Sequence, residues 1–525
     1  KIYKIVYNII KIKMGKNMKY FKELIKDYKV SKEKQLTEEC LNTEIKGISY
    51  NSRLIKKNYL FTAIKGLKDD GHKYIENAVK NKAVIIIYDN AADKNLIKEF
   101  KRKYNKVYFI AVKNPRECLA YISAKFFDEP TKKINTIAIT GTNGKTTTTY
   151  LLKSVLEASK YKTALIGTIK NMIGKSEIKT NLTTPESIDL ENIFYKSLKK
   201  EVSHIVMESS SQALAMNRCD YLNYDTAIFT NITEDHLDYH KDMQSYLKAK
   251  LKLFSLLKES SKKKKLAIIN IDTNNFNQIY NYIKKLGIKI VTYGINENAD
   301  YYGKVISLNS KNTEYEFYAK GKFISKVKLS MLGRFNILNS LSVLAYICEY
   351  KLDIEKSIKA MRKVQVAGRF EIVTKEKHPF IAAVDYSHTP DSLENILIEA
   401  RKLNPNRVIT VFGCGGDRDR KKRPIMAQIA EKYSDIIILT ADNQRTENIN
   451  QIMNDIEKGF KNNNYKKIID RKEAIFEAVK EAKKNDIVII AGKGHETYQI
   501  FPDKTIHFDD REEAKEALKK YYPNI

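Results

Sequence analysis

Cysteine, glycine and long apolar runs are all scarce in this sequence. Its 525 residues include five cysteines that lie far apart and form no C-x-x-C motif: Cys40, Cys118, Cys219, Cys348 and Cys414. So few separated cysteines indicate reduced thiols, and hence a cytoplasmic protein. No apolar run approaches the ~18 residues of a membrane helix, so we expect no membrane association. The N-terminus also lacks the pattern of a secretory signal.

Acidic residues are scarce relative to basic ones. The 94 Lys and Arg residues exceed the 63 Asp and Glu residues, which gives a net charge of +31. This charge by itself suggests a nucleic-acid-binding protein. The lysines, however, are spread along the whole chain, and clusters such as Lys262 to Lys265 lie between ordinary globular segments. We therefore interpret the charge as a solvated Lys-rich surface suited to anionic small substrates, and we predict no nucleic-acid partner.

The chain length predicts three or four α/β domains. The apolar content of 43% and charged content of 30% are typical of a soluble enzyme. We expect the beginning of the chain to be a non-native or disordered leader ahead of a natural start at Met14 or Met18. The predicted divisions are the leader 1–17, then domains at 18–133, 134–363 and 364–525.

One short glycine-rich loop is the strongest motif. The apolar run Ile137 to Ile139 leads into GTNGKTT, and apolar residues then recur at helical spacing from Leu151 to Leu156. In such a strand, loop and helix, backbone N–H groups surround phosphate oxygens, the lysine reaches the terminal phosphates and the hydroxyl that follows it can hold Mg²⁺. The alternative is a turn that only packs. We predict an ATP site formed by Gly141, Thr142, Asn143, Gly144, Lys145, Thr146 and Thr147.

Two further strands are predicted to end beside this loop. The strand His204 to Met207 ends at Glu208, which is well placed to hold Mg²⁺ directly or through water. The strand Thr226 to Phe229 runs into a loop that contains His236. The position of His236 in the sequence fits a structural histidine and a residue beside the metal ion equally well.

The C-terminal part predicts a parallel sheet with four polar loops at one edge. Its strands are 382–384, 408–412, 436–439 and 487–490, and helices lie between them. Arg418 and Arg445 in these loops suit bidentate recognition of carboxylates, and Glu496 could pair with an ammonium group. The loops therefore predict a pocket for an amino acid, possibly one with two carboxylates.

In the N-terminal part, Asn114-Pro115-Arg116 follows a strand. The sequence fits equally well a simple turn with a solvated arginine and a turn with a functional role.

Ten motifs together carry a family resemblance. They occur in the order GTNGKTTT, TTPE, MESSSQAL, TNITEDHLDYH, LGRFN, AGRFE, DYSHTPDSL, FGCGGDRDRKKRP, DNQRTEN and AGKGHETYQ. In these motifs the chain resembles the Mur ligases, and within them the branch that adds the third amino acid of the peptidoglycan precursor. The resemblance implies an N-terminal UDP-binding α/β domain, a central ATPase domain with a mainly parallel sheet and a C-terminal Rossmann-like domain.

The resemblance also implies a reaction and its catalytic residues. An ATP-dependent ligase of this kind joins a diamino acid to the D-Glu γ-carboxylate of UDP-MurNAc-L-Ala-D-Glu through an acyl phosphate. The implied catalytic residues are Lys145, Lys250, His236 and Arg369, and Asn336 lies on the nucleotide side. The implied Mg²⁺ ligands are Thr146, Glu208, His236 and Lys250, the last as a carbamate, which converts a cation into a metal-binding anion.

The same resemblance assigns the substrate contacts. Those for the UDP-muramoyl dipeptide are Ser52, Leu67, Lys68, Asp69, Thr183, Thr184, Ser210 and Arg218. Those for the diamino acid are Arg418, Asp442, Asn443, Gln444, Arg445, Gly492 and Glu496. The chain departs from the common family pattern at Asn51, Gln212, Met216 and Gln444.

The choice of amino acid depends on the loop Asp442 to Arg445. Members that use meso-diaminopimelate carry Asp-Asn-Pro-Arg there, and this chain keeps the arginine but has Gln444 in place of proline. We therefore predict meso-diaminopimelate, with meso-lanthionine or L-lysine as alternatives within the same reaction. L-Lysine is the weaker of these because it would leave Arg445 without a carboxylate.

Other functions are weighed against this one. The D-Ala-D-Ala-adding ligase and folylpolyglutamate synthetase belong to the same class, but retention of the DNQR and GKGHE loops argues against them. A nucleic-acid-dependent ATPase would use the same phosphate loop and the basic charge without needing an amino-acid pocket. A catalytically silent scaffold would have lost Lys145 or Lys250. We expect a monomer.

Overall fold

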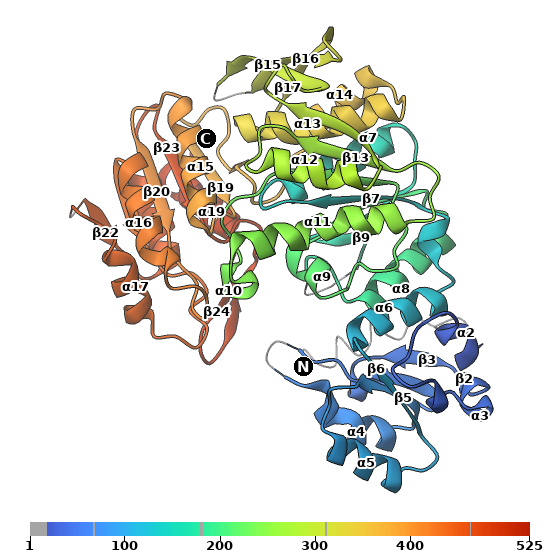
Figure 1. The fold of residues 1–525 in the computed structure, drawn as a ribbon. Coiled ribbons are helices and arrows are strands. Elements are labelled where there is room, and N and C mark those ends of the chain that lie inside the picture. The colour runs from blue at the N-terminus through green and yellow to red at the C-terminus, as the bar shows by residue number, and fades with distance from the viewer. Residues whose placement is uncertain (1–17, 67–68, 179–181, 310–311, 463) are drawn as a thin grey trace.

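Three α/β modules follow one another along the chain of this computed structural model (Figure 1). The structure describes residues 18–66, 69–178, 182–309, 312–462 and 464–525. The predicted leader and the predicted contacts Leu67 and Lys68 lie outside the described residues. All five cysteines lie within them and are free. No helix of the described segments combines the length and apolarity needed to cross a bilayer.

The first module is a four-stranded parallel sheet in the order β3-β4-β5-β6. Its two inner strands are almost entirely buried, because helices cover both faces. The helix α6 leads from this sheet toward the central module and packs with its helix α8. The elements are β1 (Lys19–Tyr20), α2 (Phe21–Ile25), η1 (Glu33–Gln35), α3 (Glu38–Leu41), β2 (Glu44–Ile45), β3 (Gly47–Ser49), η2 (Ser52–Leu54), β4 (Tyr59–Thr62), η3 (Gly71–Tyr74), α4 (Ile75–Lys80), β5 (Ala83–Asp89), α5 (Lys94–Lys103), β6 (Tyr108–Val112), α6 (Pro115–Phe126) and η4 (Pro130–Lys132).

The central module is built on an 11-stranded sheet in the order β10-β9-β8-β11-β7-β12-β13-β14-β15-β16-β17. The strands from β8 to β14 in this order are parallel, and β7 lies among them. The elements are β7 (Asn135–Thr140), α7 (Lys145–Ala158), β8 (Thr163–Ile166), β9 (Asn171–Ile173), β10 (Ser176–Ile178), α8 (Ser187–Lys199), β11 (His204–Glu208), α9 (Ser211–Ala215), β12 (Thr226–Phe229), α10 (Leu237–His240), α11 (Met243–Glu259), β13 (Leu266–Asn270), α12 (Phe276–Lys285), β14 (Lys289–Gly294), β15 (Tyr301–Leu308), β16 (Thr313–Ala319), β17 (Lys322–Leu329), α13 (Arg334–Glu349) and α14 (Ile354–Arg362).

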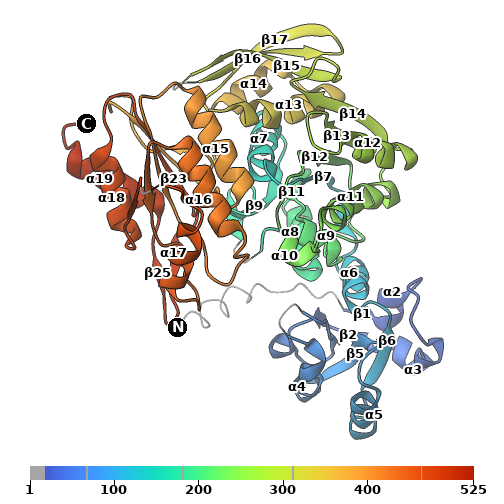
Figure 2. The same cartoon turned by 60° about the vertical axis from the view of Figure 1, so that its left-hand side comes forward.

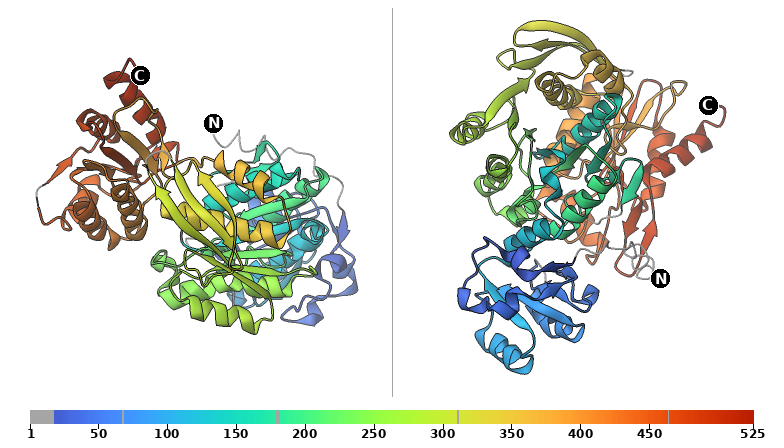
Figure 3. Two further views of the ribbon diagram at one scale, coloured as in Figure 1. Left: turned by 90° about the horizontal axis from the view of Figure 1, so that it is seen from above. Right: turned by 90° about the vertical axis from the view of Figure 1, so that its right-hand side faces the viewer.

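Helices cover both faces of the parallel part of this sheet. One apolar cluster joins the strands to α7, α13 and α14, and another joins them to α8, α9, α11 and α12. Strands buried on both sides are apolar at successive positions, as the run Ile137 to Ile139 is. The antiparallel strand β16 instead alternates buried and partly exposed residues. Strands β15 to β17 and the N-terminal module lie at opposite ends of the central module (Figure 1 and Figure 3).

The C-terminal module is a six-stranded sheet in the order β18-β19-β23-β20-β21-β22, parallel except for β18. Helix α15 faces the central module (Figure 2). The elements are β18 (Glu371–Ile372), β19 (Ile381–Asp385), α15 (Pro390–Lys402), β20 (Val408–Phe412), α16 (Lys422–Tyr433), β21 (Ile436–Leu439), α17 (Ile449–Glu457), β22 (Tyr465–Lys467), α18 (Arg471–Glu481), β23 (Ile487–Ala491), β24 (Tyr498–Ile500), β25 (Thr505–His507) and α19 (Asp510–Tyr521).

The predicted fold class is confirmed. Three α/β sheets occur in the predicted order, the central sheet is mainly parallel, and the C-terminal strands lie within a residue of their predicted bounds. The antiparallel strands at both edges of the central sheet were not predicted.

The buried His204 leads to a prediction for acid stability. Burial lowers its pKa to about 4, and its ring lies 4.2 Å from that of Tyr161 between centroids. An unfolded histidine titrates near 6.5, so the unfolded state binds more protons between about pH 4 and 6.5 and stability falls as pH decreases through this range. When the pH is lowered from 7 to 5, we expect the midpoint temperature of thermal unfolding to decrease less in His204→Gln than in the parent protein, measured by circular dichroism.

His507 provides a control in which the pKa of the histidine is shifted in the opposite direction. It is exposed, and its hydrogen bond to Glu512 raises its pKa, so His507→Gln should not reduce the acid sensitivity. Equal midpoint losses in the parent protein and His204→Gln would contradict the prediction.

Candidate functional site

Two glycines shape the phosphate loop between β7 and α7. Gly141 (φ +148°) and Gly144 (φ +86°) have backbone conformations that side chains rarely adopt. A Cβ atom at Gly141 would overlap the hydroxyl of Thr230, and one at Gly144 would overlap the side-chain oxygen of Asn339. The loop therefore lies directly against β12 and α13, which leaves no room for a larger residue at either position.

The backbone and the lysine of the loop are held by hydrogen bonds. The N–H of Thr142 donates to the carbonyl of Asn231 (2.9 Å), and the N–H of Asn143 donates to the Asn231 side chain (2.8 Å). Lys145 Nζ donates to the carbonyls of Gly141 (2.8 Å) and Thr142 (2.7 Å), so it lies over the loop. Burial lowers the pKa of Lys145. The residues predicted to bind ATP are thus contiguous in space.

Glu208 connects this loop to the neighbouring strands. Its carboxylate is fully buried at the end of β11, beside β7. It accepts hydrogen bonds from Thr146 Oγ1 (3.0 Å), from the Thr168 N–H (2.9 Å) and from Thr168 Oγ1 (2.9 Å). Sequence reasoning missed Thr168, although its position after the β8 strand and Gly167 is a signal of the same kind as that of Glu208.

Arg369 reaches the loop from the start of the C-terminal module. Its Nη2 donates to Thr146 Oγ1 at 3.4 Å, and its guanidinium carbon lies 4.9 Å from the ring centre of Tyr386. Its buried Nε has no hydrogen-bond partner among the described residues. Asn336 is buried on α13 and accepts from the Asn339 side chain (3.1 Å), so it supports the loop through that residue.

The charge of Lys145 acts on both Lys250 and His236. Lys250 is 1% exposed, and its Nζ lies 4.2 Å from the ring centre of Tyr246. Burial, reinforced by the charge of Lys145, holds the pKa of Lys250 well below its usual value. His236 is exposed, with Nε2 3.4 Å from the carboxylate of Asp235. Within the described residues, no hydrogen bond or ion pair joins His236 to Glu208, and no group of three His, Cys, Asp or Glu side chains has the arrangement of a metal site.

Asp391 brings the C-terminal module onto the phosphate loop. It lies in the first turn of α15, and its Oδ2 accepts hydrogen bonds from Asn143 Nδ2 (2.8 Å) and Thr233 Oγ1 (2.8 Å). Asp391 lies in the quoted motif DYSHTPDSL, but sequence reasoning gave it no role. The contact appears only in the folded structure, because Asn143 and Asp391 lie 248 positions apart in the chain.

Three side chains meet at the carboxyl edge of the C-terminal sheet. Asn443 Nδ2 donates to Glu496 Oε2 (2.8 Å), and Lys493 Nζ lies 3.1 Å from the same oxygen and 3.2 Å from Asn443 Oδ1. Lys493 is fully buried. The predicted pair Asn443 and Glu496 is therefore brought together. Lys493 was missed as a site residue although it lies in the quoted AGKGHE motif.

The two predicted carboxylate-binding arginines lie on neighbouring loops, Arg418 after β20 and Arg445 after β21. Arg445 Nη1 donates to the carbonyl of Gly416 (2.7 Å), and the exposed Arg418 donates to the carbonyl of the adjacent Asp417 (3.2 Å). Asp442 is buried, and Lys493 and Arg471 oppose its desolvation, so its pKa is lowered. Gly492 (φ +121°) lies against the side chain of Asp442. Gly416 lies against Gln444, and a Cβ atom added at Gly416 would overlap the carbonyl oxygen of Gln444.

The predicted dipeptide contacts adjoin Glu208. Thr183 Oγ1 accepts from Thr168 Oγ1 (3.1 Å), and Thr184 Oγ1 donates to the Glu208 carbonyl (2.8 Å) and accepts from the Ser210 N–H (3.1 Å). Arg218 Nη1 donates to the Thr184 carbonyl (3.2 Å). The predicted UDP contacts lie in the first module, where Ser52 is buried in η2 and Asp69 accepts from Tyr74 (2.6 Å).

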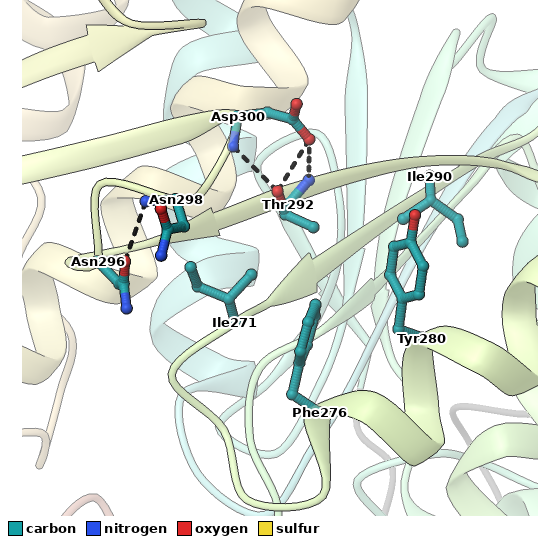
Figure 4. Close-up of a pocket in the computed structure, with 8 residues that line it drawn as sticks. All are labelled: Ile271, Phe276, Tyr280, Ile290, Thr292, Asn296, Asn298 and Asp300. Carbon is teal, nitrogen blue, oxygen red and sulfur yellow. Dashed lines mark hydrogen bonds between the residues drawn. The ribbon is translucent and has the colours of Figure 1, made fainter.

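A surface cavity of about 560 Å³ lies elsewhere on the central module, beside α12 and β14 (Figure 4). Its walls include Phe276 and Tyr280, and at its edge Thr292 bonds to Asp300. It contains none of the residues described above and is separate from the site.

The fold and site define a three-module α/β protein with a phosphate loop, an acidic strand end beside it and a cluster of polar side chains at the edge of another sheet. The chain belongs to the Mur ligase family. Residues 44–127 match the description "Mur ligase family, catalytic domain", residues 139–347 match "Mur ligase middle domain", and residues 368–494 match "Mur ligase, glutamate ligase domain".

Similar proteins cover almost the whole chain. The UDP-N-acetylmuramoyl-L-alanyl-D-glutamate–2,6-diaminopimelate ligase 1 of Clostridium acetobutylicum is 41% identical over 484 residues, which cover 92% of this chain and 96% of that protein. The ligase of the same name from Fusobacterium nucleatum is 41% identical, with coverages of 95% and 98%. A solved structure of a 2,6-diaminopimelate ligase is 27% identical, has a TM-score of 0.67 and covers 96% of this chain and 99% of its own.

The close contact at Gly144 leads to a prediction for nucleotide binding. In Gly144→Ala, the methyl group meets Asn339 and the backbone is strained, so the loop must move. We expect ATP affinity to fall at least about tenfold, measured by isothermal titration calorimetry. Gly174→Ala is the matched control, because Gly174 also has a positive φ (+59°) but has no atom within 4 Å of the added Cβ. Equal ATP affinity in Gly144→Ala and the parent protein would show that this packing is not required.

Proposed function

We propose that this protein is an ATP-dependent ligase of peptidoglycan precursor synthesis that joins meso-diaminopimelate to the D-Glu γ-carboxylate of UDP-MurNAc-L-Ala-D-Glu. The observation that carries the proposal is the position of Arg445 beside the Asn443, Lys493 and Glu496 cluster, in a chain whose relatives are named for this reaction. Glu496 in the cluster can accept a hydrogen bond from an ammonium group, and the guanidinium of Arg445 can form two parallel hydrogen bonds with a distant carboxylate.

The proposed reaction uses the family's two steps. The D-Glu γ-carboxylate attacks the terminal phosphorus of ATP and displaces ADP. The neutral amine then attacks the resulting acyl phosphate, and the tetrahedral intermediate loses a proton and expels phosphate to give the amide. The protein positions the reactants and stabilises negative charge. Lys145 exchanges its two carbonyl partners for the terminal phosphates, and Arg369, whose Nε is unpaired, faces the same charge across the module boundary.

Mg²⁺ fits the donors next to the loop. Thr146 Oγ1 and the carboxylate of Glu208 are adjacent oxygen donors of the kind that Mg²⁺ prefers. Lys250 would add a third as a carbamate, which requires a neutral amine, and the lowered pKa of this buried lysine supports that state. His236 would join the metal side. When bound, Mg²⁺ would neutralise charge on the transferring phosphoryl group.

The preferred amino acid follows from the arginines. A diamino acid with two carboxylates gives Arg445 and Arg418 a partner, with Asp442, Gln444 and Gly492 forming the surrounding loops. L-Lysine would leave the Arg445 guanidinium without its carboxylate, and an unmatched charged group costs binding energy. meso-Lanthionine keeps both carboxylates and remains the alternative.

The other substrate spans two modules. UDP would contact Ser52, Leu67, Lys68 and Asp69, and the muramoyl dipeptide would contact Thr183, Thr184, Ser210 and Arg218. The proposed domains are 18–133, 134–363 and 364–525, after a leader at 1–17. We propose that the protein works as a monomer in the cytoplasm, without nucleic acid or membrane.

A competition assay tests the proposed reaction. With UDP-MurNAc-L-Ala-D-Glu, ATP and Mg²⁺, we expect meso-diaminopimelate to be incorporated in preference to equal amounts of L-lysine and meso-lanthionine, measured by mass spectrometry. Preferential L-lysine incorporation would contradict the specificity. Failure to release one phosphate for each amide formed would contradict the reaction itself.

The carbamate on Lys250 has a separate test. Lys250→Ala should lose most ligase activity, because the Mg²⁺ site loses an anionic ligand, and should regain part of it with added short carboxylic acids. The control is Lys248→Ala on the same helix, where the side chain is exposed. Full activity in Lys250→Ala, or no response to the acids, would count against the carbamate.

A further inference from the structure

One buried carboxylate at the boundary of the first two modules holds two arginines. Glu186 lies immediately before α8, and its Oε1 is 2.9 Å from Arg218 Nε. Arg116 Nη1 lies 3.3 Å from Oε1 and 3.2 Å from Oε2 of the same carboxylate. The three side chains are only 10 to 16% exposed. In such a poorly solvated place, ion pairs are weakly screened, so the Glu186 carboxylate attracts both guanidiniums strongly.

The opposite side of Arg116 holds the loop predicted to bind UDP. Its Nε and Nη2 both donate to the carbonyl of Lys65, at 3.3 and 3.2 Å. The backbones of Lys65 and Asp70 form an isolated antiparallel β-bridge, and the Gly66 N–H donates to the carbonyl of Asp69 at 2.7 Å. Arg116 therefore holds the base of the turn that contains Asp69.

Arg218 carries the connection onward to the reacting end of the site. Its Nη1 donates to the carbonyl of Thr184, whose hydroxyl bonds to the carbonyl of Glu208. An uninterrupted series of polar contacts thus runs from the UDP loop through Arg116, Glu186 and Arg218 to the end of β11.

Further contacts keep Arg116 at this boundary. Asn114, the residue that caps α6, donates to the Asn217 side chain (3.2 Å), and Glu117 accepts from Tyr221 (3.0 Å). Both partners lie in the segment that carries Arg218. The start of α6 is therefore docked on that segment at two points, and α6 lies between the first sheet and helices α8 and α9 (Figure 1).

We propose that Arg116 and Glu186 are positioning residues that hold the peptide-contacting Arg218 at a set distance from the UDP loop. The two ends of the nucleotide-peptide substrate are then recognised as one unit. This inference rests on the proposed function, because it takes the ligand of this surface to be a UDP-linked muramoyl peptide. It requires the forked guanidinium of Arg116, since two acceptors on different modules are held at once.

Kinetics of two variants test the coupling. Arg116→Gln should raise the KM for UDP-MurNAc-L-Ala-D-Glu about tenfold, equivalent to about 1.4 kcal/mol, while kcat changes less than about twofold and the KM values for ATP and the diamino acid stay unchanged. Arg116→Lys should have nearly the same raised KM, because a single ammonium group cannot contact both Glu186 and the carbonyl of Lys65. Arg102→Gln, at an exposed position on α5, is the matched control and should match the parent protein.

A double-mutant cycle provides the second measurement. Because Arg116 and Arg218 share Glu186, we expect the effects of Arg116→Gln and Arg218→Lys on the KM for the nucleotide substrate to be non-additive. Additive effects, full recovery by Arg116→Lys, or an unchanged KM in Arg116→Gln would overturn the inference while leaving the ligase activity intact. If the parent protein does not ligate, the proposed function fails, and direct titration with the same nucleotide still decides whether Arg116 affects its binding.

Discussion

The buried carboxylate of Glu208 is the interaction on which the site depends most. A fully buried charge must be matched by donors, and here three hydrogen bonds come from Thr146 and Thr168. These bonds fix the start of α7 and the end of β8 relative to β11. The Glu208 carbonyl binds Thr184 as well. One residue thereby sets the positions of the phosphate loop and of the segment predicted to contact the peptide.

Polar contacts join the modules beside the site, in addition to the apolar packing at both module boundaries. Asp391 and Arg369 reach the phosphate loop from the C-terminal module, whereas Arg116 reaches Glu186 from the N-terminal module. A few hydrogen bonds and ion pairs can be exchanged for contacts with ligands more readily than a large apolar interface can be opened. This arrangement suits a ligase that must bring three substrates together from three modules.

Much of the fold could be predicted because local patterns determine its main elements. Continuous apolar runs such as Val408 to Phe412 indicate strands buried on both faces, and GTNGKTT places a phosphate loop between a strand and a helix. The antiparallel strands β15 to β17 were missed, since they contain no continuous apolar run of that kind. Thr168 and Asp391 were missed as site residues because Glu208 and Asn143, their partners, lie 40 and 248 positions away in the sequence. Lys493 was missed although its partner Glu496 lies in the same motif.

The sequence by itself determined the class of the protein, the phosphate loop and the loops that end the C-terminal strands, because each depends on residues close together in the chain. The tertiary structure alone decided which loops face each other. Asp391 meets Asn143 across 248 positions, and Arg116 meets Glu186 across 70. Such contacts depend on how the modules dock, and docking is set by surfaces assembled from distant segments, which no local pattern encodes.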